Sequence, residues 1–279
     1  MKNKSLISPV LKWVGGKRQL IGSLAELLPK RRVTSYCEPF MGGGALLFSI
    51  QPPKAWVNDV NHELIQVYEV IRDDVEPLLA ELGKHRNEPE YFYEVRDWDR
   101  DKAYYASLST VQKAARVIYL NKTCYNGLFR VNSAGEFNTP FGKYKNPNIV
   151  NAPTLRAVSA YFNAASIQFS SVDYAELLPK LDKDTFVYLD PPYDPVSTTA
   201  NFTGYAKGGF DKREQLRLCE FCHELDRRKI RFMLSNSATD FIKGIYSKYR
   251  LTTVQAKRAV NSVAAKRGTV DEIVVRNYG

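Results

Sequence analysis

Short apolar segments that alternate with helical patterns in the C-terminal part of the chain constrain the fold most. Four segments look like strands, namely IQFSS, TFVYLD, RFMLSN and EIVVRNY, and residues 212–228 and 238–249 have the apolar spacing of helices. Strands that are joined by helices through short loops are typical of a doubly wound sheet. We therefore predict an α/β fold.

The N-terminal part begins the same alternation. Residues 17–28 have helical spacing that Pro29 ends. TSYCEPF and AWVND are short apolar runs with turn residues after each, which suits parallel strands. Both ends of the chain are therefore expected to contribute to one sheet.

An insertion separates these two parts of the predicted sheet. Residues 63–159 have mostly helical periodicity, but residues 121–150 are rich in Asn, Gly, Pro and aromatic side chains. The triplet SAG at residues 133–135 is typical of the turn of a hairpin. We predict one domain from residues 1–62 and 160–279, and a second domain, helical with a hairpin, from residues 63–159.

Charge and composition narrow the classes of partner. The chain of 279 residues is 44% hydrophobic, and its 40 Lys and Arg against 30 Asp and Glu give a net charge of +10. A basic excess favours a polyanionic partner, because each cation near a phosphate releases a counterion. No apolar run approaches the ~18 residues of a membrane span, and the basic N-terminus lacks a signal-peptide pattern. Four cysteines do not suggest a disulfide scaffold, so we expect a soluble cytoplasmic protein.

A glycine turn follows the first predicted strand. CEPFMGGGALLFSI places Gly42, Gly43 and Gly44 before a helix, and Asp59 ends the next strand. Glycines let a ligand approach the backbone, and a carboxylate can hold ribose hydroxyls. The spacing F-x-G-x-G differs from the dinucleotide pattern, and no basic residue is present in the turn for a pyrophosphate. The pattern indicates a nucleoside without phosphates, with a plain glycine-rich turn as an equal alternative.

The segment YLDPPYDP follows the apolar run TFVYL and carries clearer chemistry. Asp190 lies at the carboxyl end of a predicted strand, and Pro191 and Pro192 stiffen the turn after it. The carboxylate and the Pro191 carbonyl are two acceptors side by side, which suits an NH₂ group, and the ring of Tyr193 suits a planar base. Holding both hydrogens in acceptors aims the nitrogen lone pair at an electrophile. The alternative is a simple proline turn with a core tyrosine.

Four blocks in fixed order resemble a known family. LKWVGGKRQL, EPFMGGG, YNGLFRVNSAGEFNTPFGKYKNP and LDPPYDP are similar to the Dam-type DNA adenine-N6 methyltransferases, and the match spans nearly the whole chain. The resemblance implies a Rossmann-like methyltransferase sheet with a target-recognition insertion. It also implies methyl transfer from S-adenosylmethionine to adenine N6 in double-stranded DNA, within GATC, after the base is flipped out of the helix. S-adenosylhomocysteine would be the product, no metal is expected, and the enzyme is expected to be a monomer on cytoplasmic DNA.

The resemblance also assigns roles to individual residues. The catalytic motif would be Asp190, Pro191, Pro192 and Tyr193. The cofactor would be held by Trp13, Lys17, Glu38, Phe40, Gly42, Gly44, Asp59, Asp173 and Asp190. Methyl transfer would be direct attack of N6 on the sulfonium methyl, with Asp190 mainly positioning the amine.

The insertion has the composition of a nucleic-acid interface. From residue 110 to 150 six cations stand against Glu136 alone, and aromatic residues are interleaved with them; the cations are Lys113, Arg116, Lys122, Arg130, Lys143 and Lys145. A solvated hairpin with core aromatics is the alternative. The resemblance puts Tyr125 and Asn126 next to the flipped base and Arg130 on a guanine. It puts Leu128 and Pro140 on a thymine methyl, and Lys12 and Tyr144 near the outer base pair.

Other functions remain open from the residues alone. Methylation of RNA or of a protein amide uses the same chemistry, a nicotinamide oxidoreductase would use the glycine turn without a role for DPPY, and a DNA-binding module without activity needs neither. Protection of DNA from a partner restriction nuclease and marking of DNA for repair or regulation are both compatible with the sequence. CEFCH at residues 219–223 matches a haem-attachment pattern but lies on an amphipathic helix, so we set it aside. We predict a mobile lid at residues 197–209, and phosphate contacts from the basic pairs at 257–258 and 266–267 are an open alternative to a solvated loop.

Overall fold

The computed structural model describes residues 6–196, 209–257 and 269–279, and the chain divides into two compact units. The first unit contains residues 1–16, 42–51 and 61–171, and the second contains residues 17–41, 52–60 and 172–279. The expected lid, apart from Gly209, and the loop between the basic pairs lie outside the described residues. The functional division into a catalytic and a recognition domain stays a prediction.

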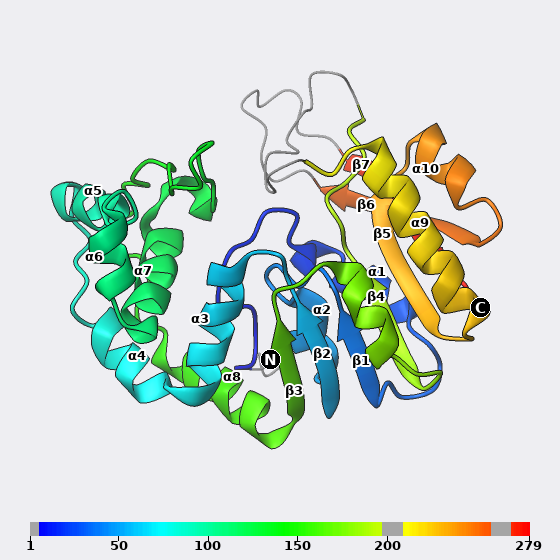
Figure 1. Ribbon diagram of the computed structural model, residues 1–279, viewed down its shortest axis with the longest axis horizontal. Coiled ribbons are helices and arrows are strands. Elements are labelled where there is room, and N and C mark those ends of the chain that lie inside the picture. The colour runs from blue at the N-terminus through cyan, green and yellow to red at the C-terminus, as the bar shows by residue number, and fades with distance from the viewer. Residues whose placement is uncertain (1–5, 197–208, 258–268) are drawn as a thin grey trace. The chain divides into compact units, whose positions relative to one another are not determined.

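A mixed sheet forms the centre of the second unit, and its strands lie in the order β2-β1-β4-β5-β7-β6 (Figure 1). They are β1 (Ser35–Glu38), β2 (Lys54–Asn58), β4 (Thr185–Leu189), β5 (Arg231–Ser237), β6 (Arg250–Lys257) and β7 (Thr269–Arg276). The first four strands in this order are parallel, and β7 runs antiparallel to both β5 and β6. The predicted α/β fold is confirmed. Strand β6 was not predicted, because LTTVQAK lacks a continuous apolar run.

Helices of the second unit cover this sheet. They are α1 (Ile21–Leu27), α9 (Lys212–Arg227) and α10 (Asp240–Ile245), with the 3-10 helices η1 (Lys17–Gln19) and η3 (Tyr174–Lys180). The apolar face of α9, including Phe221 and Cys222, packs in one core with Val187 and Leu234 of the sheet. Figure 1 shows α9 lying along the strands. The haem-like cysteines are thus core residues, and all four cysteines of the chain are buried free thiols.

Two of the predicted helices are shorter in the structure. The predicted helix at 17–28 is divided into η1 and α1, and α10 is limited to its central part. Thr239 has an extended backbone and caps α10, because its hydroxyl accepts from the backbone N–H of Ile242 at 3.3 Å, so the helix begins at Asp240. Helix α10 ends at Ile245, directly after Gly244, which is a poor helix former.

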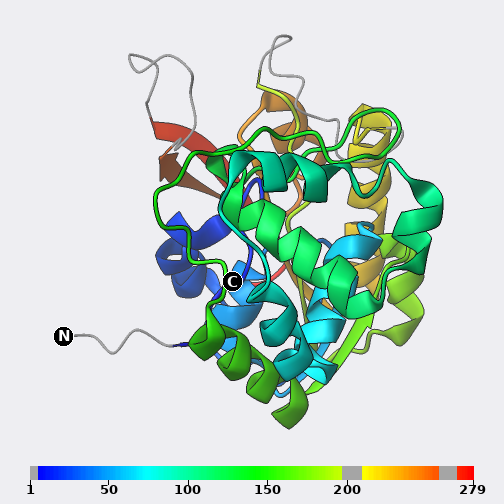
Figure 2. The same cartoon turned by 90° about the vertical axis from the view of Figure 1, so that its left-hand side faces the viewer.

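The first unit is mainly helical, as the periodicity predicts. Its elements are α2 (Ala45–Ile50), α3 (His62–Asp73), α4 (Val75–Leu82), α5 (Pro89–Asp97), α6 (Lys102–Ser107), α7 (Thr110–Thr123), η2 (Tyr125–Gly127), α8 (Ala152–Ala164) and strand β3 (Ser166–Ser170). Helices α3, α4 and α5 pack against α7, and this group of helices faces the viewer in Figure 2. Ser109 and Gln112 form a capping box at the start of α7.

The segment after α7 contains the predicted hairpin. Val131 and Phe137 form an antiparallel bridge, and the N–H of Gly135 donates to the carbonyl of Asn132 at 3.0 Å. Gly135 has a φ of +82°, which glycine adopts at little cost. The expected turn at residues 133–135 is confirmed. In the part of the chain that the structure describes, no helix is long and apolar enough to cross a membrane.

Candidate active site

Three acidic side chains lie where parallel strands of the second unit end. Glu38 is the last residue of β1, Asp59 follows β2 directly, and Asp190 follows β4. Because these strands are parallel neighbours, their carboxyl ends meet at one edge of the sheet. Glu38 is buried and accepts a hydrogen bond of 2.9 Å from the hydroxyl of Tyr36. The edge therefore gathers three carboxylates, which are acceptors for hydroxyl or amino hydrogens.

Asn58 ties the loops around this edge together. Its side-chain amide donates to the carbonyls of Pro39 at 3.1 Å and Val172 at 3.0 Å. The next residue, Asp173, caps η3 and receives two hydrogen bonds from Arg217, at 2.9 and 2.5 Å. The hydrogen bonds from Arg217 lower the pKa of Asp173, so this carboxylate stays ionised. The predicted cofactor contact Asp173 therefore lies in a fixed ion pair that the sequence did not suggest.

Phe40 contributes a flat surface to the same edge. Its ring centroid lies 5.2 Å from that of Tyr174 and 6.0 Å from that of Phe210. The guanidinium of Arg217 lies 4.8 Å from the Tyr174 ring centroid. Tyr174 and Phe210 are buried, whereas Phe40 is only partly buried, so Phe40 is the ring of this group that another planar group can contact.

Lys17 joins two members of the DPPY motif. Its ammonium lies 2.8 Å from Oδ1 of Asp190 and 4.5 Å from the ring centroid of Tyr193. The side chain of Lys17 is only 6% exposed, so the pair is screened little by solvent. The Tyr193 hydroxyl in turn donates to a carboxylate oxygen of Glu272, on β7, at 2.7 Å. The structure thus brings together three of the expected site residues, Lys17, Asp190 and Tyr193, and adds Glu272.

The Asp190 carboxyl has an unusual proton affinity. Burial raises its pKa to about 6, and the negative charge of Glu272 also raises it, whereas the nearby Lys17 lowers it. Burial also raises the pKa of the Tyr193 phenol, as do the charges of Asp190 and Glu272. Asp190 is therefore a carboxylate at neutral pH that binds a proton more readily than an exposed aspartate, while Tyr193 stays protonated.

Buried side chains hold the backbone of the DPPY loop. The Gln215 amide on α9 donates to the carbonyl of Pro192 at 2.9 Å, and Asn236 on β5 accepts from the backbone N–H of Asp194 at 3.0 Å. The two amides also bond to each other at 3.0 Å. Ser237 donates its hydroxyl to the carbonyl of Asp194 at 2.5 Å. The proline turn is therefore held from outside as well as stiffened from within.

The glycine turn belongs to the first unit from Gly42 onward. Gly42 and Gly44 have φ values of +48° and +63°, and a Cβ on Gly42 would lie 2.9 Å from Cδ1 of Trp13. Tyr68 donates its hydroxyl to the carbonyl of Gly42 at 3.2 Å. The turn therefore requires glycine at this position, and it brings Trp13 against the backbone, where the resemblance places both in cofactor binding.

The residues expected to contact DNA are mostly exposed in the first unit. Tyr125 is 55% exposed, and Asn126, Arg130 and Pro140 are exposed too. The Arg130 guanidinium donates to the side chain of Asn138 at 2.8 Å, which holds it on the hairpin. These groups can reach a large partner without a change in the core.

Lys12, which lies far away in the sequence, joins this region. Asn121 accepts from the N–H of Lys12 at 2.9 Å and donates to its carbonyl at 2.7 Å. The Lys12 ammonium lies 5.6 Å from the ring centroid of Tyr144. Gly127 has a φ of +66°, and a Cβ there would lie 2.6 Å from the Lys12 side chain. Lys12 and Tyr144, which the resemblance places near the outer base pair, thus lie next to each other in the first unit.

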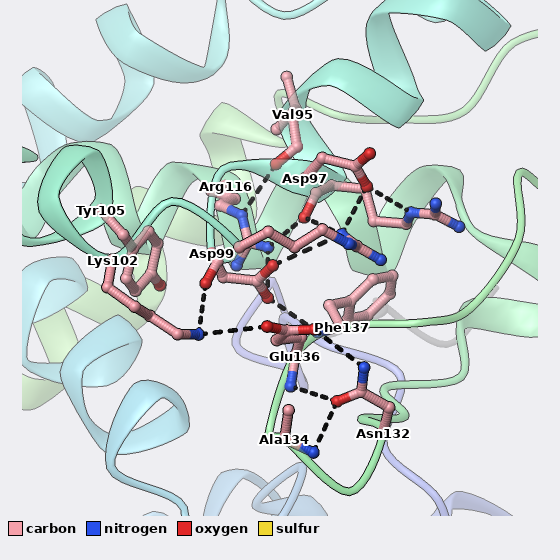
Figure 3. Close-up of polar contacts among 12 residues, drawn as sticks. Val95, Asp97, Asp99, Lys102, Tyr105, Arg116, Asn132, Ala134, Glu136 and Phe137 are labelled. Atoms are coloured by element: carbon pink, nitrogen blue, oxygen red, sulfur yellow. Dashed lines mark hydrogen bonds and ion pairs between the residues drawn. The ribbon is translucent and has the colours of Figure 1, made fainter.

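A buried ion pair lies beneath the hairpin (Figure 3). Arg116 on α7 is 1% exposed and lies 2.7 Å from the Asp99 carboxylate, and it also donates to the carbonyl of Val95 at 2.9 Å. Asp99 accepts from the backbone N–H of Phe137 at 2.8 Å. At the turn, the Asn132 side chain accepts from the N–H of Ala134 at 3.0 Å. Arg116 of α7 and Asp99, which follows α5, therefore anchor the hairpin through one carboxylate.

Two of the six cations expected to bind phosphates make contacts within the protein. Arg116 is buried in the ion pair, and Lys122 donates to the carbonyl of Val10. For Arg116 the interpretation as a phosphate contact was wrong, because this residue lies on the buried face of α7. For Lys122, which is only partly buried, it stays a prediction. Among the residues that sequence reasoning missed, Glu272, Gln215 and Asn236 lie on regular elements where a polar residue carries no local signal. Only the position of Asn236 at the end of an apolar strand could have suggested it.

Comparisons with known proteins show the family of the chain. A family model described as D12 class N6 adenine-specific DNA methyltransferase matches residues 13–260. The type II methyltransferase M1.LlaDCHI of Lactococcus lactis subsp. cremoris is 40% identical over 280 residues, which cover 100% of this chain and 98% of that protein. The type II methyltransferase M.MjaIII of Methanocaldococcus jannaschii is 38% identical over 98% of this chain and 99% of its own. The DNA adenine methylase of Escherichia coli K12 is 33% identical over 95% of this chain and 93% of its own. The chain belongs to the D12 class of N6 adenine-specific DNA methyltransferases.

Proposed function

We propose that the protein transfers a methyl group from S-adenosylmethionine to N6 of adenine in double-stranded DNA, within GATC, with the adenine turned out of the helix. One observation carries the proposal beyond family membership. Asp190 and Tyr193 are held in one stiff proline turn. The Lys17 ammonium contacts the Asp190 carboxylate and lies over the face of the Tyr193 ring. This is the chemistry needed for an amino group on a stacked base.

The residues present fit an S-adenosylmethionine ligand. Gly42 and Gly44 adopt positive φ, so a ligand can approach their backbone, and no basic residue in this turn calls for a phosphate. When bound, the cofactor supplies an electrophilic methyl group on a sulfonium sulfur. The residues that we propose to hold it are Trp13, Lys17, Glu38, Phe40, Gly42, Gly44, Asp59, Asp173 and Asp190. Asp59 would accept from the ribose hydroxyls, and Lys17 would hold the methionine carboxylate.

The DPPY motif would position the adenine. The carboxylate of Asp190 and the carbonyl of Pro191 would accept the two N6 hydrogens, and Tyr193 would stack on the base. Because Gln215 and Asn236 hold the turn, these acceptors keep their direction when the base arrives. Alignment of the amine lone pair with the methyl group supplies a large part of the rate.

Asp190 would also take the proton that N6 loses. The amino nitrogen gains a bond to carbon and must lose one hydrogen to become neutral. Burial raises the pKa of Asp190 to about 6, so its carboxylate accepts that proton more readily than an exposed aspartate does. The proton can then pass to solvent as the product leaves.

The insertion, residues 63–159, would read the DNA sequence. Arg130 would donate to O6 and N7 of a guanine in the major groove, and Leu128 and Pro140 would contact a thymine methyl. Tyr125 and Asn126 would lie next to the flipped base, and Lys12 and Tyr144 would lie near the outer base pair. The exposure of Arg130 and Tyr125 supports this role.

A methylation assay with labelled cofactor tests the proposal. The substrates are a duplex with one GATC, duplexes with one altered base in that site, a duplex with N6-methyladenine in place of the target, and a transfer RNA. We expect label only in the unaltered GATC duplex. That duplex should then resist nucleases that cut GATC only when its adenine is unmethylated. Label in the RNA would favour the alternative substrate, and equal label in the altered duplexes would contradict the GATC assignment.

A further inference from the structure

Glu272 contacts the DPPY motif, although the proposed methyl transfer gives it no role. The Tyr193 hydroxyl donates to its carboxylate at 2.7 Å. Glu272 is partly buried on β7, where its backbone pairs with Ser237 of β5 on one side and Val254 of β6 on the other. Ser237 also holds the DPPY loop through the carbonyl of Asp194. The carboxylate and the tyrosine that it holds are therefore fixed by the same part of the sheet.

The face of the Tyr193 ring holds a positive charge in this structure. The Lys17 ammonium lies 4.5 Å from the ring centroid, within the range of a cation–π interaction. A phenol that donates to a carboxylate shifts electron density toward its ring, because the hydroxyl proton is partly drawn to the acceptor. The contact with Glu272 thus strengthens the attraction of the ring for a cation. The connected side chains are the Lys17 ammonium, the Tyr193 phenol and the carboxylates of Asp190 and Glu272.

Methyl transfer moves positive charge onto the group that we propose to stack on this ring. The N6 lone pair forms a bond to the methyl carbon, the bond between that carbon and sulfur breaks, and its electron pair stays on sulfur. The sulfonium becomes a neutral thioether while the adenine becomes cationic, until a proton leaves N6 for the Asp190 carboxylate. A group that attracts the cationic base more than the neutral base lowers the barrier.

We propose that Glu272 is a positioning residue for methyl transfer, which orients the Tyr193 phenol and makes its ring a better partner for adenine as the base gains positive charge. The inference rests on the proposed function, since it needs adenine on Tyr193. A purely structural tie between β7 and the DPPY loop is the competing explanation. The two differ in one respect: the structural tie affects stability or substrate affinity, whereas the proposed role affects the rate of transfer.

The test is a double-mutant cycle with Glu272→Gln and Tyr193→Phe. Glu272→Gln keeps a hydrogen-bond acceptor and removes the charge, and Tyr193→Phe keeps the ring and removes the hydroxyl. Single-turnover methylation of the GATC duplex is measured at pH 8, together with the dissociation constants of the duplex and of S-adenosylmethionine. We expect Glu272→Gln to slow transfer about tenfold, within the size of a cation–π interaction, with both dissociation constants within about twofold of wild type.

The outcome in the double variant decides the mechanism. If Glu272 acts through the phenol, Glu272→Gln changes nothing further in the Tyr193→Phe background. If the same loss persists there, the charge acts on Asp190 directly, and the inference is wrong. An unchanged rate in the single variant also overturns it, as does a loss confined to binding.

Controls separate this test from folding and from the proposed function. Asp271→Asn, which removes the neighbouring exposed carboxylate of β7, is expected to keep the wild-type rate. Glu272→Gln should keep the wild-type unfolding midpoint within a few degrees; a large drop would assign Glu272 a structural role instead. Wild-type protein that fails to methylate adenine contradicts the proposed function, whereas an active wild type with an equally active Glu272→Gln contradicts this inference alone.

Discussion

The DPPY loop and the hairpin after α7 solve opposite problems. In the loop, the reactive groups Asp190 and Tyr193 are turned inward, and neutral amides of Gln215 and Asn236 hold the backbone. In the hairpin, the reading side chain Arg130 is exposed, and a buried charge pair lies beneath the backbone. Chemistry on a small group needs partners removed from water, whereas reading a duplex needs groups that protrude.

The difference extends to what each support permits. Amides can hold the catalytic loop without placing a further charge next to Asp190, whose pKa depends on nearby charges. The side chains proposed to read DNA do not depend on a shifted pKa. A carboxylate and a guanidinium can therefore anchor the hairpin without changing the chemistry of those side chains. We therefore expect damage to the loop to appear as lost rate, and damage beneath the hairpin to appear as lost stability and lost discrimination.

Removing the Asp190 carboxylate should have the largest effect. Asp190→Ala is expected to lower methyl transfer by more than about a thousandfold, because both the acceptor for N6 and the proton acceptor are lost. The protein should stay folded, as circular dichroism would check. Full activity of this variant in the labelled-methyl assay would contradict the site assignment.

Breaking the ion pair beneath the hairpin should mainly cost stability. Arg116→Met leaves Asp99 without its guanidinium partner, and such buried pairs cost about 3–5 kcal/mol when one partner is removed. Urea unfolding measures the loss, and Lys113→Met on the same helix is the matched control, since Lys113 is not fully buried. At a temperature where the variant is folded, its preference for GATC over altered sites should fall. Unchanged stability would show that the pair is not an anchor.

Titration of Asp190 in the DPPY loop should make both the free energy of unfolding and the rate of methyl transfer depend on pH. Substitutions in the hairpin should leave that dependence unchanged. Burial raises its pKa from 3.8 to about 6, so the native state binds a proton that the unfolded state has released. As pH rises from about 4 to about 6, this group lowers the free energy of unfolding by about 3 kcal/mol, while methyl transfer rises because the carboxylate forms. Asp190→Asn should remove that part of the stability change in urea titrations, and Arg130→Ala should not. The same pH profile in Asp190→Asn as in wild type would refute the assignment.

Removing the proposed guanine contact should have the smallest effect. Arg130→Ala is expected to cost about 1–3 kcal/mol of discrimination at one base pair, with little change in stability. Competition between GATC and single-base variants measures the discrimination, and Lys145→Ala, which removes an exposed cation from the same region, is the control that should weaken all sites alike. Unchanged discrimination in Arg130→Ala would exclude the contact.

Local patterns reveal the loop and the hairpin turn, but not what holds them. The strand-and-helix alternation predicts the sheet, and the letters DPPY and SAG mark turns through proline and glycine chemistry. Gln215 and Glu272 come from elements far from the loop in sequence, and their contacts depend on strand order and register, which no local pattern gives. Arg116 shows the reverse failure, since a cation on a helix looks the same in sequence whether it meets phosphate or a buried carboxylate. Arg217 likewise gives no hint that it pairs with Asp173.

The four buried cysteines can report local opening of the structure, because a buried thiol reacts with an alkylating reagent only when it becomes exposed. Burial raises the pKa of the Cys124 thiol to about 12 and that of Cys219 to about 11, so at neutral pH these groups stay protonated and resist alkylation. Cys124 lies at the base of the hairpin in the first unit, and Cys37, Cys219 and Cys222 lie in the second. A timed pulse of iodoacetamide followed by peptide mapping would therefore measure the rate at which each unit opens, from the alkylation rates of its own cysteines.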